Sequence, residues 1–162
     1  GMEREGFMRR KNRQETHLGE IAEVIGRCGV IPLGLSAPEG AYIVPMNFGW
    51  EMEDDHPMFY MHAALEGRKL DLIAASGRAG FEMDCSHRLI AGPNACDFSY
   101  RYESVIGTGA AELLTDPAEK AHALAVIVAH YSGRELPVPP EAVARVTIIR
   151  LRADEFACKR RL

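Results

Sequence analysis

The chain has 162 residues, a length that fits one domain with a sizeable core, and 47% of its residues are hydrophobic. Its 19 Lys and Arg against 23 Asp and Glu give a formal net charge of -4, which argues against a nucleic-acid partner. No apolar stretch is long enough to span a membrane, the N-terminus lacks the apolar region of a signal peptide, and the four cysteines form no Cys-x-x-Cys pair. We therefore expect a cytoplasmic protein with reduced thiols, no membrane partner and no metal site.

The first half of the chain predicts one helix followed by short strands. Leu18, Ile21 and Ile25 fall at helical spacing, which predicts a helix over residues 14–27 that Gly29 ends. Strands are then expected over residues 30–35, 42–50 and 58–63, with an acidic hairpin connection over residues 51–57.

The second half continues the same pattern with longer strands. Thr115, Asp116 and Pro117 open a strong helix, with proline just inside its start. Gly107 and Gly109 indicate a bend or bulge. The remaining expected elements are a helix over residues 65–75, a strand over 79–85, a loop over 87–94, one or two strands within 98–114 and a last strand over 143–151.

Many short antiparallel strands with helices at the margins argue against a doubly wound parallel sheet. The pattern is typical of a mainly β fold, a small β-barrel with peripheral helices. We expect a single domain over residues 1–162, of which residues 1–13 form a flexible N-terminal segment. Gly1, ahead of Met2, has the character of an expression-tag remnant.

Residues 42–50 (Tyr-Ile-Val-Pro-Met-Asn-Phe-Gly-Trp) are unusual for a strand. Pro45 removes one ladder donor, which confines the strand to a sheet edge or a bulge. Asn47 is a polar residue among large apolar ones. A broken edge of this kind leaves backbone groups free to bond a planar, polar ligand, although an ordinary bulged edge strand has the same pattern.

Residues 59–69 run from a strand directly into the start of a helix that carries two adjacent cations. Arg68 and Lys69 fall where free backbone N–H groups gather, which indicates a phosphate site. Two cations on a solvated helix face are the alternative. His62 ends the strand, as a structural histidine or as a reactive one.

Residues 100–109 alternate aromatic, basic and hydroxyl side chains before Gly107 and Gly109. This glycine pair does not lead from a strand into a helix with dinucleotide-loop spacing, so we interpret it as a close backbone approach or a bulge.

Three segments, which follow a basic stretch over residues 8–13, together carry a family resemblance. They are residues 44–49 (Val-Pro-Met-Asn-Phe-Gly), 60–69 (Tyr-Met-His-Ala-Ala-Leu-Glu-Gly-Arg-Lys) and 102–107 (Tyr-Glu-Ser-Val-Ile-Gly). Together they resemble the Nim-like (5-nitroimidazole-resistance) branch of the pyridoxamine 5'-phosphate oxidase-related FMN-binding split-barrel family. The resemblance implies a homodimeric split β-barrel with FMN at the subunit interface, and an oxidoreductase that reduces small acceptors with a nicotinamide or other donor.

The resemblance also implies roles for particular residues. Arg68 and Lys69 would grip the FMN phosphate, and His62 would lie on the substrate side of the flavin as the catalytic residue. Ser104 and Val105 would reach the flavin of the partner subunit. The residues implied to line or flank the cofactor are Val44, Pro45, Met46, Asn47, Tyr60, Met61 and His62.

Two departures from the family pattern stand out. Ala63 replaces a common Ser, and Phe156-Ala157-Cys158-Lys159 replaces a more usual Thr-Gly-Lys ending. The alternatives that stay open are a haem or deazaflavin in place of FMN, a non-enzymatic flavin sensor, and a structural dimer whose Arg68 and Lys69 face water.

Overall fold

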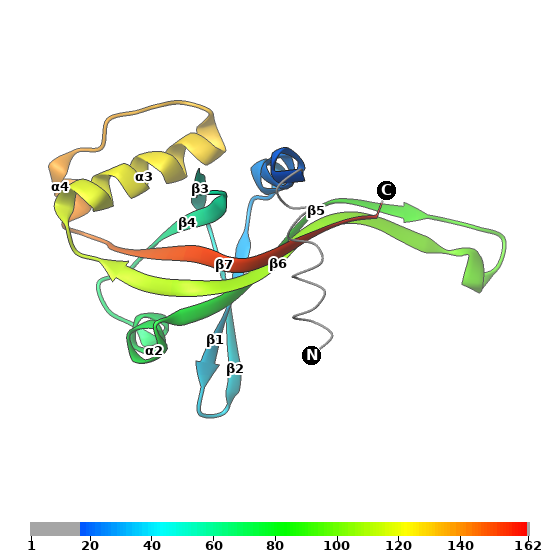
Figure 1. Cartoon of the computed structure of the whole chain (residues 1–162), viewed down its shortest axis with the longest axis horizontal. Helices are drawn as coiled ribbons and strands as arrows, with labels where there is room; N and C mark the ends of the chain where they lie inside the picture. The colour runs from blue at the N-terminus through cyan, green and yellow to red at the C-terminus, as the bar shows by residue number, and fades with distance from the viewer. Residues whose placement is uncertain (1–16, 162) are drawn as a thin grey trace.

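The computed structural model describes residues 17–161, so the expected flexible segment over residues 1–13 lies outside the described part of the chain. Residues 17–27 are helical, and a series of strands follows (Figure 1). The strands are β1 (Ile31–Ala37), β2 (Gly40–Met46), β3 (Gly49–Glu53), β4 (His56–Ala63), β5 (Arg78–Ile90), β6 (Ser99–Leu114) and β7 (Thr147–Arg161). The further helices are α2 (Arg68–Ser76), the 3-10 turn η1 (Ala95–Asp97), α3 (Pro117–Ser132) and α4 (Pro140–Val143).

The strands of residues 17–161 form one seven-stranded antiparallel sheet in the order β2-β1-β5-β6-β7-β4-β3. Its two edge strands, β2 and β3, are consecutive in the sequence, with Asn47 and Phe48 between them. Because two residues span only about 7 Å, the sheet must roll until its edges meet. Within the described residues no ladder joins β2 to β3, so the barrel is split at this seam, as the family resemblance implied.

The rolled sheet encloses a core of alternating side chains. Phe59 contacts Phe48 with ring centroids 5.9 Å apart and Phe81 with centroids 4.9 Å apart. The N-terminal helix adds Val24 and Ile25, both fully buried, to the same cluster. A smaller apolar cluster lies between α3 and the outer faces of β4 and β7.

Capping explains where the helices begin and end. Asp116 caps α3 by accepting a hydrogen bond from the Glu119 N–H at 3.0 Å, and Pro117 follows it as predicted. Gly77 and Gly133 end α2 and α3 in the left-handed region, at φ 65° and 70°. The helix expected over residues 65–75 begins later, at Arg68, because Gly67 takes the N-cap position with φ 153°.

Three sequence predictions are wrong in their bounds. Residues 42–50 are two strands, because the chain leaves one edge of the sheet at Met46 and enters the other at Gly49. The loop expected over residues 87–94 is largely strand, since β5 passes an irregularity at Ser86 (φ 59°) and continues to Ile90. The last strand covers Thr147–Arg161 rather than residues 143–151, and Val143 belongs to α4.

The bulge expected at Gly107 and Gly109 is confirmed. Thr108 pairs with Glu155 and Gly109 with Ala153, so β7 has one extra residue, Asp154, at this point. Beyond the last β6–β7 pair, β5 and β6 continue as a two-stranded arm (residues 86–101) that projects from the barrel (Figure 1). None of the helices within residues 17–161 has the length and apolar character that crossing a membrane requires.

Candidate functional site

The edge strand β2 is open on one side. It pairs with β1 alone, and its Pro45 lies opposite Pro32, so neither residue can donate to the ladder at this point. The expectation that Pro45 confines this strand to a sheet edge is confirmed. Val44 and Met46 turn toward the core, whereas Pro45 is exposed. Of this predicted run, Pro45 and the free backbone edge can reach a ligand.

Asn47 lies at the seam between β2 and β3 with its side chain exposed. Its Nδ2 atom is 3.3 Å from the Tyr131 hydroxyl on α3. The N–H of Phe48 donates to the same hydroxyl at 2.8 Å, and that hydroxyl donates to the Gly29 carbonyl at 2.8 Å. Tyr131 therefore joins three segments at the seam, and the sequence analysis did not identify it.

The start of α2 carries the two predicted phosphate ligands: Arg68 lies beside β2, and Lys69 follows it in the first turn, half-buried. Gly67 supplies no side-chain cap, so the N–H groups of the first turn have no capping acceptor. Arg68 is exposed, forms an ion pair with Glu39 in the β1–β2 turn, and lies 4.9 Å from the centre of the Tyr42 ring. The guanidinium beside Glu39 lowers the pKa of that carboxyl. Glu39 and Tyr42 are further residues that sequence reasoning missed.

On β4 the predicted residues alternate between interior and solvent. Met61 is fully buried in the main core, and Tyr60 is buried on the opposite face. His62 is exposed, and its side chain has no hydrogen-bond partner among residues 17–161. The β3 ladder stops at the Gly49–Tyr60 pair, which leaves the β4 edge from Met61 to Ala63 unpaired on that side. That edge and His62 are the accessible parts of this run.

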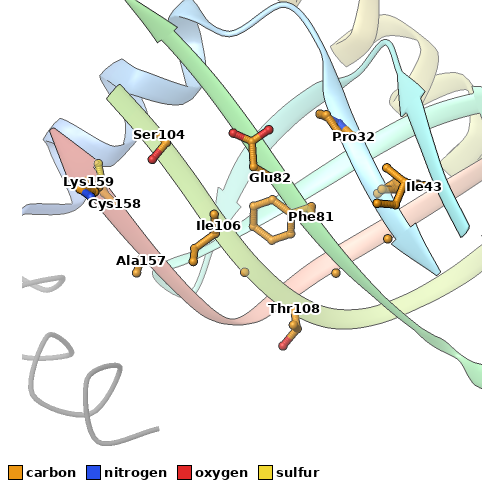
Figure 2. A pocket seen from close by; sticks show the side chains of 14 residues that line it. Pro32, Ile43, Phe81, Glu82, Ser104, Ile106, Thr108, Ala157, Cys158 and Lys159 are labelled. Carbon is orange, nitrogen blue, oxygen red and sulfur yellow. The ribbon is translucent and has the colours of Figure 1, made fainter. Parts of the chain in front are cut away.

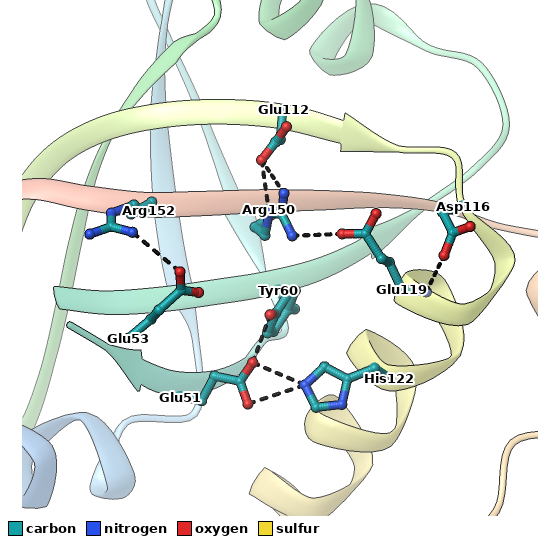
Figure 3. Close-up of polar contacts among 9 residues, drawn as sticks. All are labelled: Glu51, Glu53, Tyr60, Glu112, Asp116, Glu119, His122, Arg150 and Arg152. Atoms are coloured by element: carbon teal, nitrogen blue, oxygen red, sulfur yellow. Dashed lines mark hydrogen bonds and ion pairs between the residues drawn. The ribbon is translucent and has the colours of Figure 1, made fainter. Parts of the chain in front are cut away.

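Tyr60 itself belongs to a polar network beneath α3 (Figure 3). Its hydroxyl donates to Glu51 at 2.7 Å, and the Nε2 atom of His122 lies 2.9 Å from the same carboxylate oxygen. Burial and the Glu51 carboxylate raise the pKa of Tyr60. These bonds link α3 to β3 and β4, and the Tyr60 hydroxyl uses its proton in this structural network.

A groove of about 810 Å³ runs across the outer face of β1, β2, β5, β6 and β7 (Figure 2). Its lining includes Pro32, Ile43, Phe81, Glu82, Ser104, Ile106, Thr108, Ala157, Cys158 and Lys159. Glycines Gly34, Gly80 and Gly107 form part of the lining, and Gly34 pairs directly with Gly80. At Gly34 and Gly80 this face carries no side chain and is flat enough for a planar group, whereas a Cβ on Gly107 would point inward at Phe81 and the Glu155 carbonyl. Among the predicted cofactor residues Ser104 lines this groove, whereas Val105 is fully buried in the core.

The groove also has an ionisable edge. Burial raises the pKa of Glu82 to about 7, and the hydrogen bond and negative charge of Asp84, two residues along the same face, contribute further. The hydrogen bond with Glu82 and the ion pair with His87 lower the pKa of Asp84. The sequence signal for this pair was the alternation of Glu82 and Asp84 with apolar residues, which we interpreted only as a strand.

The fold thus divides the predicted residues. Arg68 meets β2 at Tyr42, and Ile43 next to it joins Ser104 in the groove. Asn47 lies at the seam with Tyr131, and Tyr60 lies with the α3 network. Within residues 17–161 no cluster of His, Cys, Asp and Glu has a metal-binding arrangement.

Comparison with known proteins places this geometry in a family. The solved structures similar to this chain include a candidate 5-nitroimidazole antibiotic resistance protein from Bacteroides thetaiotaomicron VPI-5482, with 28% identity and a TM-score of 0.74 over 86% of this chain and 81% of that one. They also include a flavocytochrome from Azotobacter vinelandii (22% identity, TM-score 0.71, 88% and 66% of the two chains) and an FAD- and haem-binding protein from Mycobacterium smegmatis (18%, 0.74, 88% and 70%). The latter two share the fold. No curated protein matches the sequence.

The family profile described as pyridoxamine 5'-phosphate oxidase matches residues 18–160, which is nearly all of the described chain. The family resemblance in the three sequence segments is therefore confirmed. The chain belongs to the pyridoxamine 5'-phosphate oxidase family.

Proposed function

We propose that this protein binds FMN and works as an oxidoreductase that reduces small acceptors, nitro compounds among them. The observation that carries the proposal is the start of α2, an uncapped helical turn that carries Arg68 and Lys69, from which Arg68 reaches Tyr42 on the open edge strand β2. A cytoplasmic location belongs to the same proposal.

The α2 start has the chemistry of a phosphate site. The free N–H groups of the first turn favour an anion, and two cations add charge at the same place. Glu39 holds the Arg68 guanidinium over the Tyr42 ring, so the cation is already oriented before a ligand arrives. A phosphate would accept hydrogen bonds from the guanidinium N–H groups that Glu39 leaves free.

The distance along β2 suits the rest of the cofactor. Tyr42 and Asn47 are five residues apart, which along a strand is about 17 Å, close to the length of an extended FMN molecule. Val44, Pro45 and Met46 lie between them, and their open edge offers backbone groups to a flavin ring. The free edge of β4 at Met61, next to Tyr60, would flank the ring from the other side of the seam.

The second subunit completes the site in this proposal. Ile43 and Ile106 are 69% and 48% exposed, and both line the same groove. A homodimer would cover them and bring Ser104 of one chain, with Val105 behind it, to the flavin of the other. Light scattering on the purified protein tests this directly: a monomer at micromolar concentration contradicts it.

The flavin would supply the electron transfer, and the chain would bind and orient it. His62, exposed at the end of β4, is the proposed catalytic residue, orienting the acceptor or delivering a proton. We expect His62→Ala to lower kcat with a nitro acceptor while FMN affinity stays within about threefold. Unchanged turnover with every accepted substrate would remove His62 from the mechanism.

A paired titration tests the cofactor. Arg68→Ala and Lys69→Ala should each weaken FMN binding at least about tenfold and leave riboflavin, which lacks the phosphate, almost unaffected. The control is Arg134→Ala, an exposed arginine after α3, which should change neither affinity. A protein that is colourless as purified and does not take up FMN would refute the proposal.

Haem binding is the second candidate, because two proteins of the same fold are described as a flavocytochrome and as an FAD- and haem-binding protein. His62 is the exposed side chain that could serve as an axial ligand. A Soret band in the purified protein, lost in His62→Ala, would favour haem over FMN. A deazaflavin would differ from both in its absorption spectrum, and a flavin that binds without NAD(P)H turnover would indicate a sensor.

A further inference from the structure

The hydroxyl of Tyr131 occupies the seam of the barrel and has three polar neighbours. It lies 2.8 Å from the Gly29 carbonyl oxygen, 2.8 Å from the Phe48 nitrogen and 3.3 Å from Asn47 Nδ2. A tyrosine hydroxyl has one proton to donate and two lone pairs. The distribution of that proton decides how the Asn47 amide can be oriented.

The Tyr131 hydroxyl uses its one proton in the hydrogen bond to the Gly29 carbonyl. A carbonyl oxygen can only accept, and Phe48 N–H can only donate, so the hydroxyl donates to Gly29 and accepts from Phe48. One lone pair is left, and it can bond a donor but not the oxygen of an amide. Asn47 must therefore turn its NH2 group to Tyr131 and its Oδ1 atom away, toward solvent.

The position of this hydroxyl is well fixed. The neighbouring His130 places its Nε2 atom 2.7 Å from the Cys28 carbonyl and its ring 4.4 Å from the Phe48 ring centre. At the next turn β3 approaches so closely that a Cβ on Gly49 would lie 2.5 Å from the Ile127 nitrogen. The C-terminal half of α3 is thus anchored to both sides of the seam, and Tyr131 cannot follow a rotating Asn47 side chain.

We propose that Tyr131 is a positioning residue that sets the Asn47 amide with its oxygen outward, so that the site accepts a hydrogen bond from the N3–H of a bound flavin. This inference rests on the proposed function. The polar edge of the flavin ring has one N–H between two carbonyl groups. An outward Asn47 Oδ1 complements the N–H, whereas an outward NH2 would complement the carbonyls.

Comparison of FMN with 3-methyl-FMN, which lacks this N–H, tests the inference. Wild-type protein should bind FMN about tenfold more tightly than 3-methyl-FMN, the upper end of what one hydrogen bond contributes. Tyr131→Phe frees the amide to rotate, so the preference should fall below about threefold. Tyr100→Phe, an exposed tyrosine on the arm, is the matched control and should keep the full preference.

Asn47→Ala separates positioning from folding, because it leaves the Tyr131 bonds to Gly29 and Phe48 in place. It should abolish the preference with little change in thermal stability. Equal wild-type affinity for the two flavins would overturn the inference and leave the proposed function standing, whereas failure to bind either flavin would refute both. A preference that persists in Asn47→Ala, or in Tyr131→Phe, would also overturn it.

Discussion

Glu103 on β6 is a buried carboxylate whose removal should destabilise the protein strongly. Its side chain is 4% exposed and accepts hydrogen bonds from Arg27 at 2.9 Å, from Ser86 at 2.6 Å and from the Nε atom of Arg160 at 2.6 Å. These partners come from the N-terminal helix, from β5 and from β7. One carboxylate therefore joins four elements at the base of the arm.

The magnitude follows from these contacts. A hydrogen bond to a charged group contributes about 1.5–3 kcal/mol, so three such donors set an upper bound near 9 kcal/mol. Arg27 and Arg160 are 43% and 29% exposed, so water can hydrate both guanidinium groups once the carboxylate is removed, and this lowers the cost. We expect Glu103→Ala to cost about 3 kcal/mol, which at a urea m-value near 2 kcal/mol/M moves the unfolding midpoint by about 1.5 M.

Urea denaturation followed by circular dichroism, at one fixed protein concentration, measures this shift. Glu112→Ala is the matched control. Glu112 also bonds an arginine, Arg150, but is 57% exposed, so its loss should move the midpoint by less than about 0.5 M. Equal shifts for the two variants would refute the argument that burial and convergence make Glu103 important.

The pH dependence has a definite sign. The Ser86 hydroxyl and the two guanidinium groups hold the pKa of Glu103 below its usual 4.5. Stability from this carboxylate is fully present above the unfolded-state pKa and is lost as the pH falls through the lower folded-state pKa. The difference between wild type and Glu103→Gln should therefore be constant above about pH 5 and should narrow below about pH 4.

Two further variants and one labelling experiment test other parts of the fold. Gly49→Ala should destabilise by at least about 2 kcal/mol in a thermal melt because a Cβ would lie 2.5 Å from the α3 backbone, whereas Gly26→Ala, with nothing within 4 Å, should not destabilise. Burial raises the pKa of Glu82 to about 7, above its unfolded value, so the stability of the wild type should fall as the pH rises from about 4 to 7. Glu82→Gln should remove that fall. An unchanged pH profile in the variant would contradict the assignment to Glu82. Iodoacetamide should alkylate the exposed Cys96 in the native protein and reach Cys28, whose pKa burial raises, only on unfolding, as peptide mass spectrometry would record.

Local chemistry predicted the elements whose ends are set locally. The Asp116–Pro117 start of α3 and the glycine that ends α2 could be identified from neighbours in the sequence, because capping involves residues within one turn. The full length of β7 could not. Its last residues, including Arg160, are polar and charged, and they are strand because β6 pairs with them and Glu103 binds Arg160.

The sequence allowed the two cations of the candidate site to be predicted, but not the residues that the fold places around them. Arg68 and Lys69 could be predicted as phosphate ligands because they follow a glycine at the start of a helix. Glu39, which pairs with Arg68, is 29 residues away, and Tyr131, which bonds Asn47, is 84 residues away. Spacings of that size have no periodic signal, so these partners appear only once the sheet has rolled up.

The most informative error is the single strand expected over residues 42–50, because it falls where we place the flavin. A strand that continued through Asn47 and Phe48 would use the Phe48 N–H in a ladder and would alternate Asn47 with its neighbours. The observed break gives that N–H to Tyr131 and leaves the Asn47 side chain at the open seam. The local preference for a continuous strand is overruled at the position where a ligand would need a fixed polar group. The break between the two edge strands therefore leaves a polar side chain, held by Tyr131, at the place where the proposed flavin site needs one.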